Sequence, residues 1–210
     1  MKSIMANGRV VYTIGHSNHT AERFVGLLCQ HGITAVVDVR SVPYSRMQSQ
    51  FDRKSLARDL KEHGIAYVFL GRELGGRSDD PSCYEKGRVR YQLLAQTKAF
   101  REGLERVYKG SENHRISLMC AEREPLECHR TLLISRELER VGIKVVHIHA
   151  DGHLESHEEA IRRLLQRLGM PEQDLFRTRS EMIDEAYLKQ EARIAHVNEQ
   201  LTQEAPERRS

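Results

Sequence analysis

Two cysteines and a histidine fall within ten residues near the middle of the chain, at Cys120, Cys128 and His129. Glu122 and Arg130 belong to the same segment and add a carboxylate and a guanidinium group. Thiol, imidazole and carboxylate groups are the ones that enzymes use as nucleophiles and as proton carriers. This segment is therefore the first candidate for a reactive site.

The flanking residues predict that this segment joins a strand to a helix. Residues 115–119 are mostly apolar and predict a buried strand. Ile134, Leu138 and Val141 then recur at helical spacing, and Gly142 is expected to end the helix. Such a turn offers free backbone N–H groups and the positive end of a helix dipole, which favour an anion or a thiolate.

The composition limits the classes of function. A chain of 210 residues can form one domain with a substantial core. The net charge of +3 combines 33 basic with 30 acidic residues, and this balance does not by itself indicate nucleic-acid binding. No apolar run approaches the roughly 20 residues of a membrane span, and residues 1–9 lack the apolar core of a signal peptide. We expect a cytoplasmic protein without a membrane partner, with four reduced cysteines.

Strands and helices are predicted to alternate along the chain. Short apolar runs predict strands at 10–14, 35–39, 65–70, 115–119 and 144–149. Helical spacing predicts helices at 20–30, 52–62, 91–108, 131–142 and 155–168. The pattern predicts an α/β fold, a three-layer, Rossmann-like sandwich with a mainly parallel sheet. This α/β domain is expected at 8–170, followed at 171–210 by a charged helical tail, helical at 181–201 and partly disordered at its end.

Polar residues follow the end of each predicted strand. In parallel sheets, ligands bind beyond the carboxyl ends of the strands. The candidate residues there are His16, Asp38, Arg40, Arg46, Arg77, Cys120, Glu122, Cys128, His129 and Arg130. We expect them to surround one cleft, whereas Cys29 is expected to be buried on its helix and residues 71–88 to form an irregular loop.

Several short motifs resemble those of the family called domain of unknown function 488. They are Gly15-His16-Ser17, Asp38-Val39-Arg40, Leu74-Gly75-Gly76 and Cys-Ala-Glu-x-x-Pro-x-x-Cys-His-Arg at 120–130. The resemblance covers about residues 11–148, and the last motif is its most specific part. It implies an α/β sandwich, a bacterial or archaeal origin and a cytosolic location. It implies no mechanism, because the family name states that none is known.

The main hypothesis is an enzyme with Cys120 as its nucleophile or redox thiol. The helix start, Arg130 and His16 would lower the pKa of this thiol. Glu122 and His129 are the candidate proton carriers. The sequence leaves transfer, hydrolysis and redox chemistry open, and the alternative is a buried structural thiol surrounded by ion pairs.

The arginines predict a small anionic substrate, phosphorylated or nucleotide-like, since guanidinium groups bind phosphate and carboxylate through paired N–H groups. The candidate substrate-binding residues are Arg40, Asp38, Arg46, Arg77, Arg130 and Cys128. The alternative is that several arginines pair with nearby acids and only support the fold. For Arg130 the expected partner is the carboxylate of Glu122 or Asp38, or a ligand anion.

Two interpretations without catalysis remain. A metal site would draw on His16, Cys120, Cys128 and His129, but the cysteines are far apart for a zinc motif. Neighbouring residues on a helix also point about 100° apart, so Cys128 and His129 are not expected to reach one ion. We therefore assign no metal ligand, and the sequence identifies neither a cofactor nor an oligomeric state. A nucleic-acid-binding module would use the arginine loops and residues 86–90, but it would not need clustered thiols.

Overall fold

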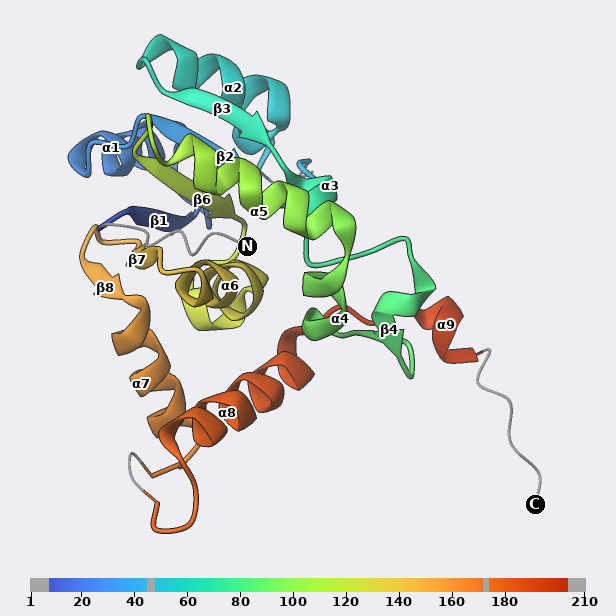
Figure 1. Cartoon of the computed structure of the whole chain (residues 1–210). Coiled ribbons are helices and arrows are strands. Elements are labelled where there is room, and N and C mark those ends of the chain that lie inside the picture. Colours follow the sequence, from blue (N-terminus) through green and yellow to red (C-terminus); the bar gives the residue numbers. More distant parts are fainter. Residues whose placement is uncertain (1–7, 45–47, 172–173, 204–210) are drawn as a thin grey trace.

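The computed structural model describes residues 8–44, 48–171 and 174–203 and shows one six-stranded sheet between layers of helices (Figure 1). The strands of the sheet are β1 (Val10–Gly15), β2 (Ala35–Asp38), β3 (Ala66–Phe69), β6 (Ile116–Cys120), β7 (Lys144–Ile148) and β8 (Leu154–Ser156). Their order is β3-β2-β6-β1-β7-β8; β8 runs antiparallel to β7, and the other pairs are parallel. The predicted fold class is confirmed.

Helices cover both faces of the sheet. The first layer contains α1 (Ala21–Gln30) and α2 (Arg53–Glu62), and the second contains α5 (Lys98–Gly110), α6 (Arg136–Arg140) and α7 (His157–Arg167). Successive residues of a strand point to opposite faces of the sheet. Val36 and Met119 pack toward α1 and α2, whereas Val37 and Leu118 pack toward the other helix layer. Because both faces are covered, the central strands are apolar almost throughout. Among the described residues, no helix combines the length and apolar character that crossing a membrane requires.

Some elements differ from those predicted. The helix expected at 91–108 is interrupted at Thr97, whose extended backbone separates α4 (Tyr91–Gln96) from α5. The helix expected at 131–142 begins as a π-helical segment, η4 (Arg130–Ser135), and continues as α6, which leaves Val141 exposed. The segment expected to be irregular contains short elements, namely α3 (Gly71–Leu74), a 3-10 turn at Pro81–Cys83, and a hairpin of β4 (Tyr84–Glu85) and β5 (Arg88–Val89).

The C-terminal helices pack against the sheet domain. The helix expected at 181–201 is divided at Ala195 into α8 (Arg179–Ile194) and α9 (Glu199–Gln203). α8 buries apolar side chains, including Met182, in the same core as β6 and α5. In Figure 1, α8 runs from the end of α7 toward α4. The segment after it then pairs with the β4–β5 hairpin, where Val89 N donates to His196 O at 3.0 Å. The expected disorder at the chain end concerns residues 204–210, which lie outside the described residues.

A chain of buried polar side chains links α8 to the sheet. The Thr13 hydroxyl on β1 lies 2.8 Å from His147 Nδ1 on β7. The other ring nitrogen of His147 lies 3.2 Å from His157 Nδ1, at the start of α7. The Nε2 atom of His157 then lies 2.7 Å from the Tyr187 hydroxyl on α8. Burial lowers the pKa of His157 to about 4 and that of His147 well below its usual value, so both rings are neutral at pH 7.

We expect acid to weaken the fold through His157, which faces His147 on β7, Tyr187 on α8 and Glu155 on β8. The pKa of this imidazole is about 4 in the fold and about 6.5 in an unfolded chain. The unfolded state therefore takes up the proton first as the pH falls. The stability contribution is complete above pH 6.5 and is lost progressively toward pH 4.

Between pH 7 and pH 4.5 this single group should cost about 2–3 kcal/mol of unfolding free energy. Urea unfolding at both pH values should show a smaller acid loss for His157→Gln than for the wild type. The exposed His63, replaced by Gln, is the matched control and should behave like the wild type. Equal acid losses in all three proteins would contradict the assignment.

Candidate active site

A cavity of about 290 Å³ opens at the carboxyl edge of the sheet. Of the ten candidate residues, those that line it are Arg40, Arg77, Cys120, Glu122, Cys128 and His129. His16 and Asp38 lie behind Arg40 and hold it, and Arg130 is buried below the loop. Arg46 lies outside the described residues. The expected convergence of strand-end residues therefore holds for residues on β2, β6 and the following loops.

Backbone contacts fix the loop that carries the two cysteines. β6 ends at Cys120, whose carbonyl accepts a hydrogen bond from His16 N at 2.9 Å. Gly15 passes so close to this loop that a Cβ atom there would lie 1.9 Å from Glu122 O, so only glycine fits. A 3-10 turn at Pro125–Glu127 then leads into Cys128.

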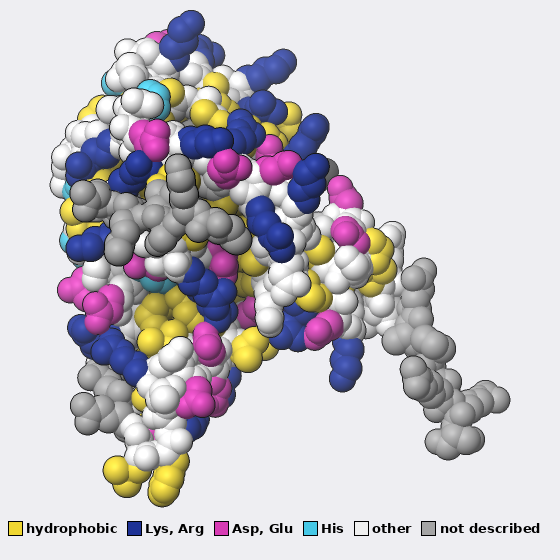
Figure 2. Space-filling view, in the orientation of Figure 1, with side chains coloured by type: hydrophobic (Ala, Val, Ile, Leu, Met, Phe, Trp, Pro, Cys, Tyr) yellow, Lys and Arg dark blue, Asp and Glu magenta, His cyan; other side chains and the backbone are white. Residues whose placement is uncertain are grey.

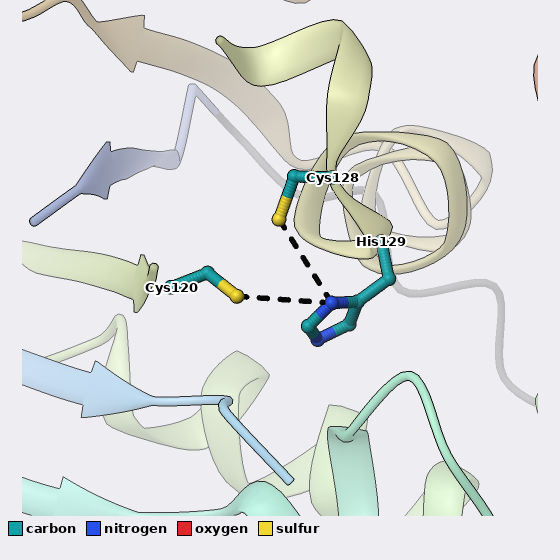
Figure 3. A group of neighbouring side chains, drawn as sticks. All are labelled: Cys120, Cys128 and His129. Atoms are coloured by element: carbon teal, nitrogen blue, oxygen red, sulfur yellow. Dashed lines mark hydrogen bonds between the residues drawn. The ribbon is translucent and has the colours of Figure 1, made fainter. Parts of the chain in front are cut away.

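Both thiols face the same nitrogen of His129 (Figure 3). The distance to His129 Nδ1 is 3.8 Å from Cys120 Sγ and 3.8 Å from Cys128 Sγ. The other ring nitrogen, Nε2, lies 3.0 Å from Val39 O. A carbonyl oxygen only accepts, so in the neutral ring Nε2 carries the hydrogen and the Nδ1 lone pair points at the sulfurs. The two sulfur atoms and this nitrogen all lie within 4.8 Å of one another, close enough to bind one metal ion.

The argument from helical spacing against a shared site for Cys128 and His129 is therefore wrong. Cys128 is not helical: its φ of −140° and ψ of 141° are those of an extended residue. The helical backbone begins only at His129. The two side chains consequently do not diverge as neighbours on a helix would, and both reach Cys120.

The surroundings distinguish the two thiols. Burial raises the pKa of Cys120 well above its usual value, and the neighbouring Cys128 adds to the effect. Burial also acts to raise the pKa of Cys128. A hydrogen bond from the Cys120 thiol and the positive charges of Arg130 and His129 outweigh burial, so the pKa of Cys128 falls well below its usual value. Arg130 N, at the helix start, also lies 3.4 Å from Cys128 Sγ. The helix start thus favours a thiolate at Cys128, whereas the sequence predicted it at Cys120.

Two groups beside Cys128 respond to its charge. The carboxylate of Glu122 lies 3.0 Å from Cys128 Sγ, at the wall of the cavity. Partial burial of this carboxyl group, together with the negative charge of Cys128, raises the pKa of Glu122. Burial acts to lower the pKa of His129, but the charge of Cys128 outweighs it and raises this pKa. These shifts favour a proton on Glu122 or His129 over a proton on Cys128.

A buried ion pair positions Arg40 at the cavity. Its Nε and Nη2 atoms donate to Asp38 Oδ1 and Oδ2 at 2.9 and 2.7 Å, and the Tyr67 hydroxyl donates to the same carboxylate. Burial lowers the pKa of His16 to about 4, so its neutral Nε2 accepts from Arg40 Nη1 at 3.3 Å. The other ring nitrogen of His16 bonds to Ser17 O. The His16 side chain therefore orients Arg40. Its contact with Cys120 is a hydrogen bond between the two backbones, so the structure does not support the expected role of His16 as a partner of the Cys120 thiol.

Of the two partners expected for Arg130, the carboxylate of Glu122 or Asp38 is wrong. The side chain is fully buried, and its Nη1 donates to the backbone carbonyl of Glu122 at 2.7 Å instead of to a carboxylate. Nη2 lies 3.4 Å from the carbonyl of Arg123. Arg130 thus stabilises the loop through hydrogen bonds from inside the fold. Its contribution to the site is a buried positive charge next to Cys128.

Sequence reasoning missed two cavity residues of α8 and its C-terminal extension, Ile194 and His196. Their contribution depends on packing between distant segments, which has no local sequence signal. The contact of Gly76 with His129 was not predicted either. The only sequence signal for it is the glycine pair in the Leu74-Gly75-Gly76 motif. A Cβ atom on Gly76 would lie 2.9 Å from His129 Cγ, so glycine leaves room for the imidazole.

The prediction that Cys29 is buried is wrong. Cys29 is exposed on α1, whereas Cys120 and Cys128 are buried, at 3% and 1% exposure. The prediction rested on neighbouring apolar residues of the helix, but Leu27 and Leu28 fill the inward face and Cys29 turns away from it. Small reagents that enter the cavity are therefore needed to probe the buried pair.

Comparisons with known proteins support the family to which the resemblance pointed. No curated protein and no solved structure matched the chain. A family profile matched residues 20–136, a narrower range than the expected 11–148, with Gly15-His16-Ser17 outside it. The match spans more than half of the chain, and the chain therefore belongs to the family described as Domain of unknown function DUF488.

Proposed function

We propose that the cavity is the active site of a cysteine-dependent enzyme that acts on a small anion. The observation that carries the proposal is the composition of one cavity wall: Cys120, Cys128 and His129 meet there, and Arg77 lies in the same lining. The reactive groups lie at the carboxyl edge of a parallel sheet, where α/β proteins bind their ligands. The reduced thiols suit the cytoplasm.

The charge of the cavity suits a phosphorylated or carboxylated substrate. Arg77 is exposed at the cavity and makes no hydrogen bond or ion pair with another described residue, so its guanidinium is available to a ligand. Arg40 has acceptors among the described residues for four of its five side-chain N–H groups. It therefore supplies a fixed positive charge and at most one further hydrogen bond. Arg77 is the main candidate for direct anion contact.

The reaction class that fits is nucleophilic attack on an electrophilic carbon or phosphorus atom of the bound anion. The Cys128 thiolate, an imidazole and a carboxylate lie together and can provide a nucleophile and a site for its proton. Glu122 is the proton carrier in this proposal, because its carboxylate lies at the cavity wall, 3.0 Å from Cys128 Sγ.

A nucleic-acid-binding function has weaker support. Two arginines of the 86–90 segment are engaged within the fold: Arg90 pairs with Glu191 at 2.8 Å, and Arg88 donates to Ala195 O at 3.3 Å. On the face shown in Figure 2, basic side chains alternate with acidic ones and form no continuous basic surface. Binding to a phosphate backbone requires several basic groups presented together.

We expect anions such as phosphate, sulfate or AMP to raise the melting temperature of the wild type, and Arg77→Ala to lose most of this shift. An anion at a hundredfold excess over its Kd stabilises a protein by about 2.7 kcal/mol, which corresponds to roughly 5–10 °C for a chain of this size. Without ligand, Arg77→Ala should melt like the wild type, since it removes no described contact.

The control is Arg72→Ala, which removes an exposed arginine of α3 outside the cavity lining. This variant should keep the full shift with every anion. If no anion stabilises the wild type, or if both variants retain the shift, the anionic substrate is excluded from this site.

A further inference from the structure

We propose that Cys120, Cys128 and His129 bind a zinc ion, with its fourth coordination position open to the cavity. This inference rests on the proposed function and identifies the cofactor of the same site. Two thiolates and an imidazole with an open fourth position are a ligand set of catalytic zinc. The two sulfur atoms and His129 Nδ1 lie within 4.8 Å of one another.

The distances fit tetrahedral zinc. Zn–S bonds of about 2.3 Å and Zn–N bonds of about 2.0–2.1 Å place sulfur and nitrogen about 3.5–3.6 Å apart at a tetrahedral angle. Both sulfur atoms lie 3.8 Å from His129 Nδ1. Each sulfur–nitrogen distance is therefore within a few tenths of an ångström of the value at a zinc ion. The two sulfur atoms lie within 4.8 Å of each other, against about 3.8 Å when both bind the ion.

The groups behind the ligands are those of a metal site. A histidine ligand commonly donates its second ring N–H to a carbonyl, which directs the other nitrogen at the metal. The Nε2 atom of His129 lies 3.0 Å from Val39 O in this manner. Cys128 Sγ lies 3.4 Å from Arg130 N, a contact that stabilises a thiolate ligand. Gly76 packs against the imidazole, where a larger residue would displace it.

The fourth position would hold the attacking water. The three ligands line the cavity together with Glu122 and Arg77, so water and a bound anion have access to the ion. With zinc bound, the nucleophile of the proposed reaction would be water in place of a cysteine sulfur, and the reaction would be a hydrolysis. Glu122 would accept a proton from the zinc-bound water, and the resulting hydroxide would form a bond to the electrophilic atom of the anion. The bond to the leaving group then breaks, and the leaving group takes the proton from Glu122. The cysteines act as ligands throughout and are not consumed.

Metal titration of the full chain tests the proposal. Reduced protein freed of metal with a chelator should bind one zinc ion per chain by native mass spectrometry. Cobalt(II) should give the charge-transfer absorption of thiolate coordination. Cys120→Ser, Cys128→Ser and His129→Gln should each weaken zinc binding at least tenfold, a loss reported even for groups that only support metal ligands. Circular dichroism of the zinc-free variants should confirm that they remain folded.

Cys29→Ser and Cys83→Ser are the matched controls, since both cysteines lie outside the cluster. They should keep the affinity of the wild type. A wild type that binds no zinc, or lacks the thiolate absorption with cobalt, overturns the proposal without recourse to any variant. So does a control that loses as much affinity as the ligand variants.

Anion stabilisation, measured with and without zinc, separates this proposal from the proposed function. If zinc binds at the cluster but no anion shifts the melting temperature, the metal site is supported and the anionic substrate is excluded. An anion-induced shift lost in Arg77→Ala, in a protein that binds no zinc, would retain the anion site and remove the metal.

Discussion

Replacing Arg130 with alanine should lower the free energy of unfolding by about 3–5 kcal/mol. The side chain is fully buried and donates to the carbonyl oxygens of Glu122 and Arg123. Alanine would leave both oxygens without this donor, and each buried unsatisfied group costs about 1–3 kcal/mol. It would also open a cavity of the size of a long side chain.

Urea unfolding of Arg130→Ala, next to Arg123→Ala, measures this effect. Arg123 belongs to the same loop, but its side chain is exposed, so its removal should change stability by no more than about 0.5 kcal/mol. If instead Arg130→Ala unfolded like the wild type and lost only the stabilisation by anions, Arg130 would be a ligand-binding residue, as one sequence-based hypothesis held.

Asp38→Asn should be about as destabilising, at about 3–5 kcal/mol, because it breaks a buried ion pair and leaves the charge of Arg40 uncompensated. Both side chains are buried, with exposed fractions of 0% for Asp38 and 5% for Arg40. The carboxylate accepts hydrogen bonds from Arg40 and from the Tyr67 hydroxyl. Asparagine keeps the shape of the side chain but removes its charge.

The matched control for this change is Asp59→Asn. Asp59 pairs with the exposed Arg58 at 3.2 Å, and such surface pairs contribute only about 0–1 kcal/mol. Urea unfolding should therefore separate the two variants clearly. Similar free energies of unfolding for Asp38→Asn and Asp59→Asn would show that the buried pair does not hold Arg40 in place.

The convergence of the site could be predicted because it follows from topology. Parallel strands end at one edge, so polar residues after β2 and β6 had to meet there. The apolar strands and the end of α1 just before Gly32 likewise have local signals in the sequence. These features place Arg40 and Cys120 on one cavity without any knowledge of side-chain contacts.

The details of the site could not be predicted, because they depend on single backbone conformations and on distant packing. The extended conformation of Cys128 brings its thiol and His129 together. Glu124 and Pro125 mark the start of the turn before it, but not the backbone conformation that follows the turn. The partner of Arg130 is the main chain, which a search for opposite charges does not find. His196 reaches the cavity only because α8 packs across the domain.

The zinc site can be tested with a crystal of the reduced protein prepared with zinc, using diffraction data collected at the zinc absorption edge. We expect one anomalous peak about 2.3 Å from the Sγ atoms of Cys120 and Cys128 and about 2.0–2.1 Å from His129 Nδ1. Its fourth ligand should be a water or an anion on the side of Arg77. No anomalous peak at the cluster, or a peak only elsewhere on the chain, would contradict the zinc site.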